Sequence, residues 1–379
     1  MSAPLGGMSE SEFLQDYWQK KPLLIRQAFP GFVPELDSGD IAGLACEELA
    51  DSRWVSGSFP AHDWALRYGP FEESLFSTLP ETHWTLLVQD VEKHFPPLRR
   101  LLDRFSFLPR WRVDDLMASV AAPGGSVGPH VDQYDVFLLQ AQGRRRWHIA
   151  ESFQPDLLPD CELNVLKSFE SEQEWVLETG DMLYLPPGIA HHGVALEECM
   201  TWSVGMRAPS SADLFLALGE WLAGEHAEGP RYSDPGLEPG FLPGELDQDA
   251  RRRFQSLVNP ASADAYSFDD FLGAFLSEYR LAHRPAPAAA PIGAIELEQA
   301  LSNGRTLQQN PWTRLLWTGD SMAVTLFAAG MRYSCSRELA CLVCDPERLA
   351  SLDRALNSEE IAILCKLLND GHLYLESEQ

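Results

Sequence analysis

The chain has 379 residues, of which 45% are hydrophobic and 10% aromatic, a composition typical of a globular protein with room for two or three domains. No apolar run reaches the length that a membrane span requires, and the N-terminal residues do not form a secretory signal. The formal net charge of −27 disfavours a phosphate backbone as partner and favours a basic protein, although solubility alone also accounts for an acidic surface.

Residues 1–110 alternate predicted helices with short strands. A helix is expected over Glu10–Gln19, where aromatic residues fall at helical spacing before a Lys-Pro stop. A second helix is expected over Ile41–Leu49, with Asp40 as its N-cap. The other elements expected here are strands at Leu23–Ile25 and Trp84–Val88 and a helix over residues 98–108.

The section from about 111 to 208 alternates short apolar stretches with Gly and Pro turns. Many short strands at even spacing are typical of a sandwich or barrel, and a jelly roll, or double-stranded β-helix, is the natural candidate. This section is the core, about residues 95–208, of a predicted first domain over residues 1–210. The expected strands are Trp111–Ala121, Tyr134–Gln140, Arg144–Ile149, Trp175–Glu178, Met182–Leu185 and Met200–Arg207.

Residues 211–282 change to helical patterns, expected over Ala212–Leu222 and Phe268–Leu281. Paired helices after a barrel often form a dimer surface. Between them, Gly229–Gly244 is rich in Pro, Gly and acidic residues and is predicted to be a long loop or lid. Residues 283–291 are a Pro/Ala linker by composition.

Residues 292–379 are predicted to form a winged-helix-like module, with helices at Ile295–Leu301 and Ser358–Asn369 and a strand at 373–375. The module has more acids than bases, which favours a structural or protein-binding role over nucleic-acid binding. The seven cysteines of the chain are scattered, which predicts a reducing, cytoplasmic location. Cys341 and Cys344 invite a zinc interpretation, but their apolar neighbours favour core cysteines.

A metal site is indicated by His130 and Asp132, two residues apart in a stretch that is predicted to be a strand. Side chains at i and i+2 share a strand face, which would also carry Tyr134. A third ligand follows a Pro-Pro-Gly turn, at His191 or His192, and the His-x-Gly ending favours His191. Two histidines and one carboxylate with open positions are typical of non-haem Fe(II) oxygenases.

Arg145 is the candidate anchor for an anionic cosubstrate. Strand alternation places it on the apolar face with Trp147 and Ile149, which should point into the barrel. A guanidinium there needs an anion, and the carboxylate of 2-oxoglutarate is the best fit. The alternative is an internal ion pair with Asp or Glu.

A substrate pocket is a weaker prediction from Asp115, Tyr134 and Ser203. An acid, a phenol and a hydroxyl beside the metal would suit a cationic side chain. Each residue could equally be a cap or a barrel-edge residue.

The chain resembles the bacterial ribosomal oxygenases, cupin-fold JmjC-domain enzymes that hydroxylate an arginine of ribosomal protein uL16. The motifs that carry the resemblance are Trp111-Arg-Val-Asp-Asp-Leu-Met117, Gly128-Pro-His-Val-Asp-Gln-Tyr-Asp-Val-Phe137, Gly143-Arg-Arg-Arg-Trp147, Tyr184-Leu-Pro-Pro-Gly-Ile-Ala-His191, Ser203-Val-Gly-Met-Arg-Ala-Pro209 and the opening 13–26. Other JmjC proteins mostly have lysine where this chain has Arg145.

The resemblance implies Fe(II) at His130, Asp132 and His191, 2-oxoglutarate on Arg145, and O2 as the third reactant. It also implies a substrate-arginine pocket near Asp115, Tyr134 and Ser203, a dimerising helical segment over 211–282 and a terminal winged helix. The expected reaction is hydroxylation of a uL16 arginine at the β-carbon by a cytoplasmic homodimer. The alternatives are a JmjC-type lysine demethylase, a hydroxylase of another protein, or a non-catalytic ribosome-assembly module.

Overall fold

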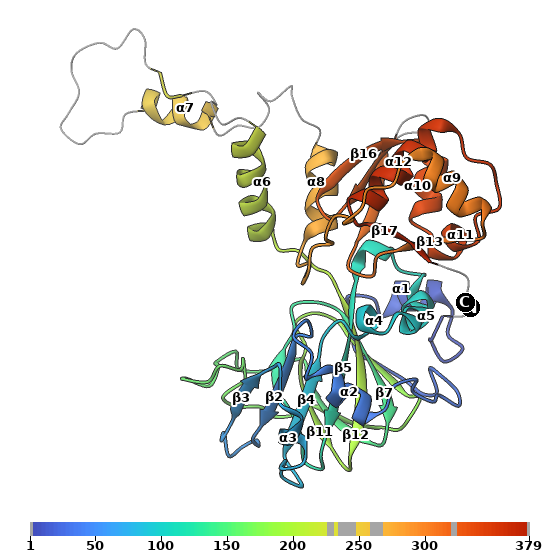
Figure 1. Cartoon of the computed structure of the whole chain (residues 1–379). Coiled ribbons are helices and arrows are strands. Elements are labelled where there is room, and N and C mark those ends of the chain that lie inside the picture. Colours follow the sequence, from blue (N-terminus) through green and yellow to red (C-terminus); the bar gives the residue numbers. More distant parts are fainter. Residues whose placement is uncertain (1–2, 226–230, 234–247, 258–267, 320–323, 377–379) are drawn as a thin grey trace. The chain divides into compact units, whose positions relative to one another are not determined.

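The computed structural model describes residues 3–225, 231–233, 248–257, 268–319 and 324–376. The chain divides into two compact units, Met1–Ala208 and Pro209–Gln379, which we describe separately (Figure 1). No helix in the described ranges combines the length and the apolar character needed to cross a membrane.

The first unit is built on two antiparallel sheets that together form the predicted double-stranded β-helix. The larger sheet has the strand order β1-β10-β7-β12-β5-β4-β2-β3, and the smaller has the order β6-β11-β8-β9. Consecutive strands often lie in different sheets, as a jelly roll requires. The strands are β1 Leu23–Ile25, β2 Ser52–Ser56, β3 Ala65–Tyr68, β4 Trp84–Val88, β5 Val113–Ala121, β6 His130–Val131, β7 Val136–Gln142, β8 Arg145–Ala150, β9 Gln173–Leu177, β10 Met182–Leu185, β11 Ala190–Ala195 and β12 Cys199–Met206.

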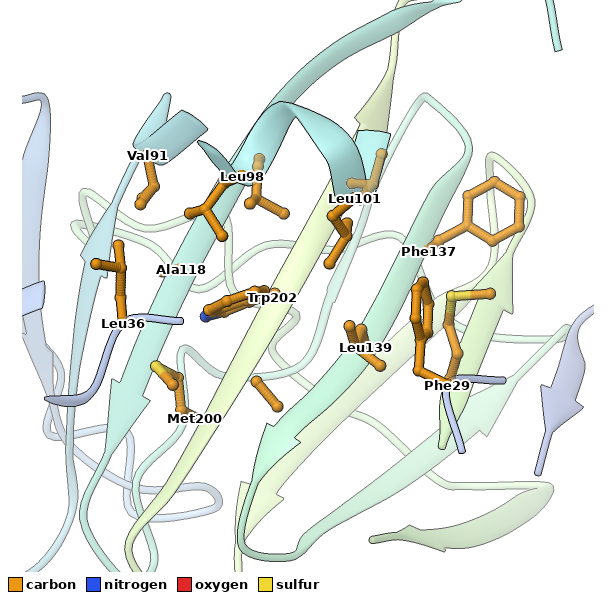
Figure 2. Packing of buried hydrophobic residues seen from close by; sticks show 14 of the residues in the cluster. Phe29, Leu36, Val91, Leu98, Leu101, Ala118, Phe137, Leu139, Met200 and Trp202 are labelled. Atoms are coloured by element: carbon orange, nitrogen blue, oxygen red, sulfur yellow. The ribbon is translucent and has the colours of Figure 1, made fainter. Parts of the chain in front are cut away.

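The larger sheet buries both faces, because apolar residues occupy both sides of its central strands. On the outer face, Trp202 pairs with Ala118 and Leu139 on the flanking strands. Figure 2 shows these side chains packed with Leu98 and Leu101. The helices of this unit are α1 Glu10–Asp16, α2 Ser38–Leu44, α3 Glu73–Phe76, α4 Val91–His94 and α5 Arg99–Leu102.

The inner face lines the barrel and has a separate, smaller apolar cluster. Leu138 and Leu183 of the larger sheet pack there with Trp147 and Ile149 of the smaller sheet. Polar residues share this inner face, which is where the candidate site lies.

Several predicted boundaries need correction. The second helix is Ser38–Leu44 and begins one turn earlier, because Asp37 is the N-cap and Asp40 closes its capping box at position N3. The helix expected over 98–108 is broken into short turns, of which α5 is one. The strand expected from Trp111 begins at Val113, after a 3₁₀ turn over Arg110–Arg112.

The second unit contains helices and two small antiparallel sheets. The three-stranded sheet has the order β14-β15-β16, and β13 pairs with β17. Helix α8 packs closely on β15 at Gly273. A Cβ at this position would lie 2.3 Å from the ring of Phe327, so a larger residue does not fit there. The elements are α6 Ser211–Glu225, α7 Gln248–Leu257, α8 Phe268–Glu278, α9 Ala294–Ser302, β13 Thr306–Gln309, β14 Leu315–Gly319, β15 Val324–Ala328, β16 Met331–Cys335, α10 Arg337–Val343, α11 Pro346–Ala350, α12 Ser358–Asn369 and β17 Leu373–Glu376.

The polar helix α7 was not predicted from the sequence. Of the loop predicted at Gly229–Gly244, only residues 231–233 fall within the described ranges, and they have no regular structure.

Candidate active site

His130, Asp132 and His191 meet at one point. Antiparallel pairing of β6 with β11 places His191 directly opposite His130. The Oδ2 of Asp132 lies 3.9 Å from Nε2 of His130 and 3.6 Å from Nε2 of His191. Their ligand atoms all lie within 4.8 Å of one another, and no other such group of three is found among the described residues.

The strand that carries the first two ligands is shorter than predicted. β6 contains only His130 and Val131, so Asp132 lies just past its end and Tyr134 lies at a bend of the loop that follows. The N–H of Gly188, in the Pro-Pro-Gly turn, donates to the carbonyl of Asp132 at 2.8 Å. This bond ties the loop of one ligand to the turn that precedes His191.

Both ligand histidines are oriented by their own backbone. Nδ1 of His130 lies 2.9 Å from the carbonyl of Gly128, and Nδ1 of His191 lies 3.0 Å from the carbonyl of Ile189. A carbonyl only accepts, so each Nδ1 donates its proton there and Nε2 is the ring nitrogen that faces the other ligands. Burial, and then the neighbouring His130, lower the pKa of His191 to about 4, which keeps this ring neutral.

His192 lies on the opposite face of β11. It pairs with His148 of β8, with their ring centroids 6.0 Å apart, and packs edge-on against Phe59 and Phe169. Burial is the main cause that lowers the pKa of His192 to about 3. The structure therefore brings His191, and not His192, to the other two ligands.

Arg145 is a buried cation without an anion. It is 3% exposed, on the same face of β8 as Trp147 and Ile149. Its Nε and Nη2 are enclosed and have no hydrogen-bond partner, and the described residues supply no carboxylate for an ion pair. The predicted alternative, an internal ion pair with Asp or Glu, is therefore not seen.

Asp115 and Ser203 lie on the cavity face of the larger sheet. Ser203 pairs with Met117, which is two residues from Asp115 and shares its face of β5. Oδ2 of Asp115 has no hydrogen-bond partner. Burial, followed by the charges of Asp114 and Glu92, raises the pKa of Asp115 to about 8.

Tyr134 links this acid to the metal ligands. Burial raises the pKa of its phenol, and the carboxylates of Asp132 and then Asp115 raise it further. Tyr134 thus lies near both Asp132 and Asp115, while Ser203 shares the inner sheet face of Asp115.

The chain matches the JmjC domain family over residues 100–214 and the ROXA-like winged-helix family over residues 262–374. It is 36% identical to the Ribosomal protein uL16 3-hydroxylase of Escherichia coli (strain K12), over 96% of this chain and 97% of that protein. The chain belongs to the JmjC-domain ribosomal oxygenases. The fold is similar to that of YcfD, a ribosomal oxygenase from Escherichia coli solved with cobalt and 2-oxoglutarate, with a TM-score of 0.82 and 32% identity over 98% of this chain and 99% of that one.

The residues of this ribosomal oxygenase fit a metal and a dicarboxylate. Two imidazoles and one carboxylate are a donor set that Fe(II) accepts, with positions left open. The unpaired guanidinium of Arg145 supplies the buried charge that a second carboxylate needs. A zinc site at Cys341 and Cys344 gains no support, since the described residues include no metal-binding group with cysteine.

Sequence reasoning missed the network that holds the loop between β6 and β7. Asp135 is fully buried and accepts hydrogen bonds from Tyr184 Oη at 2.6 Å, Arg112 Nη2 at 2.8 Å and Gln19 Nε2 at 3.0 Å. Because Asp135 follows Tyr134 directly, this network fixes the end of the loop that carries Asp132. The signal in the sequence was Asp135 at the start of an apolar strand, because a buried acid there needs hydrogen-bond partners.

Proposed function

We propose that this protein is a 2-oxoglutarate- and Fe(II)-dependent dioxygenase that hydroxylates an arginine of ribosomal protein uL16 at the β-carbon. The observation that carries the proposal is the His130, Asp132, His191 cluster in the same barrel as the unpaired Arg145. The identity with the uL16 3-hydroxylase of Escherichia coli over nearly the full length of both chains supports the substrate and the carbon.

Four residues bind the metal and the cosubstrate in this proposal. His130 and His191 bind the metal through Nε2, and Asp132 binds it through its carboxylate. Arg145 receives the distal carboxylate of 2-oxoglutarate, and His191 and Arg145 stand on adjacent paired strands of the smaller sheet. When bound, Fe(II) with 2-oxoglutarate and O2 supplies the oxidising chemistry that places one oxygen on an unactivated carbon, with release of succinate and CO2.

The substrate guanidinium is held by Asp115, Tyr134 and Ser203. The unpartnered Oδ2 of Asp115 offers an acceptor, and an arriving cation stabilises its ionised form. A buried, charge-assisted hydrogen bond of this kind both binds the side chain and orients it toward the metal.

The net charge of the protein supports a basic partner, and the exposed apolar side chains on α6 support a dimer. A protein of net charge −27 attracts a basic ribosomal protein, and the proposed location is the cytoplasm, without direct binding to nucleic acid. The helical segment 211–282 is proposed to dimerise, because Phe215 and Leu216 on α6 are 74% and 72% exposed. Light scattering of the protein and of a Phe215→Glu variant tests the dimer.

The test of the activity is incubation of the protein with recombinant bacterial uL16, Fe(II) and 2-oxoglutarate, followed by peptide mass mapping. The expected result is the gain of one oxygen on an arginine, with one succinate per oxygen. Loss of methyl groups from lysine would instead identify a demethylase. Binding of uL16 without Fe(II)-dependent succinate formation would identify a non-catalytic assembly module.

A further inference from the structure

Arg53 on β2 is a cation on the inner face of the larger sheet. It pairs with Leu87 on β4, which in turn pairs with Ser119 on β5. Paired residues share a sheet face, and Ser119 shares the face of Asp115 by alternation. The next residue, Trp54, points to the other face, where it packs against the outer apolar core.

The guanidinium of Arg53 has no protein partner. Its Nε is enclosed without a hydrogen bond, and it forms no ion pair with any described residue. Two other arginines of this unit have a carboxylate partner, which Arg53 lacks: Arg112 binds Asp135 at 2.8 Å, and Arg207 binds Asp114 at 2.9 Å.

The guanidinium of Arg53 is half-buried and its enclosed Nε has no protein partner, so it can donate to an oxygen acceptor of a bound ligand. The side chain of a target arginine cannot supply it, because two cations repel. The distal carboxylate of the cosubstrate has its own partner in Arg145, on the other sheet. The remaining acceptor is the main chain of the substrate, which stays at the mouth of the pocket while its side chain passes Tyr134.

We propose that Arg53 is a substrate-binding residue that donates hydrogen bonds to main-chain carbonyl oxygens beside the target arginine. This inference rests on the proposed function. An arginine suits the task because its planar, forked donors can reach two carbonyl oxygens at once, whereas a lysine offers a single charged point. Arg53 would thereby recognise the polypeptide, while Asp115 recognises the side chain.

The experiment compares Arg53→Met and Arg53→Lys with Arg67→Met. Arg67 lies on the same hairpin but pairs with Trp54 and so faces outward, which makes it the matched control. Labelled uL16 is titrated into the metal-free proteins. Arg53→Met should weaken binding by about 10- to 100-fold, the effect of a lost charge-assisted hydrogen bond, and Arg53→Lys by less. Arg67→Met should bind within about threefold of the unchanged protein.

Steady-state kinetics then separates the roles. For Arg53→Met the KM for uL16 should rise, while the KM for 2-oxoglutarate stays near its original value. Unchanged affinity for uL16 in both Arg53 variants would overturn the inference. Tighter binding of uL16 would also overturn it, because Arg53 would then repel the basic substrate. A raised KM for 2-oxoglutarate would also overturn it. Failure of the unchanged protein to oxidise uL16 would instead refute the proposed function, and thermal unfolding shows that each variant is folded.

Discussion

Replacing Arg145 by Met should make the protein more stable and its cosubstrate affinity much weaker. Arg145 is 3% exposed and lacks an ion-pair partner, so folding removes a charge from water without compensation. Methionine keeps much of the volume and removes this cost, and we expect a gain of about 1–3 kcal/mol in the free energy of unfolding. The loss of contact with a carboxylate should weaken 2-oxoglutarate binding by about 100- to 1000-fold.

Calorimetric melting of protein loaded with a redox-inert divalent metal measures both effects. The unchanged protein should gain about 2.7 kcal/mol when 2-oxoglutarate is present at 100 times its Kd, whereas Arg145→Met should gain almost nothing at that concentration. Arg144→Met is the control, because that neighbour is exposed and pairs with Glu197 at the surface, so its loss should change stability by less than about 1 kcal/mol. A variant that is less stable without 2-oxoglutarate, or one that 2-oxoglutarate still stabilises fully, would refute the reasoning.

The other predictions concern the triad, the loop network and a buried acid. Asp132→Ala should abolish succinate formation and weaken divalent-metal binding in calorimetric titration by more than about 100-fold; full activity would exclude it as a ligand. Tyr184→Phe removes a donor to Asp135 at 2.6 Å and should cost about 1–3 kcal/mol in urea unfolding; an unchanged midpoint would contradict the network. Burial raises the pKa of Glu92 from 4.5 to about 7, so the folded state holds this proton more tightly and stability falls as pH rises across that range. Glu92→Gln should reduce the pH-dependent change in the free energy of unfolding, measured by urea titration, by up to about 3 kcal/mol. A pH profile parallel to that of the unchanged protein would count against this prediction.

Features set by local pattern were predictable from the sequence. The strand at Met182–Leu185 is a buried apolar run between turn residues, and its predicted bounds hold to the residue. The alternation of β8 placed Arg145 on the inner face without knowledge of any neighbour. The predicted double-stranded β-helix and the winged-helix module are likewise confirmed.

Features set by competition or by distant contacts were not predictable. Asp37 and Asp40 are both good helix caps, and only the structure shows which accepts the first N–H groups. The strand at His130 stops after two residues, where its partner β11 ends at Ala190 and the Pro-Pro-Gly segment begins, which no pattern within 128–134 reveals. Arg53 escaped notice because its position in the cavity depends on registers with two other strands.

The site is best understood from two ionisable side chains that have unpartnered atoms, the buried Arg145 and the half-buried Asp115. Arg145 and Asp115 carry side chains of opposite sign in one barrel, and neither bonds to the other. The fold keeps the two groups apart, with Arg145 on the smaller sheet and Asp115 on the larger. In the proposed function, an anionic cosubstrate and a cationic substrate therefore approach the same triad from different sheets without competing, and each ligand supplies the charge that its side lacks.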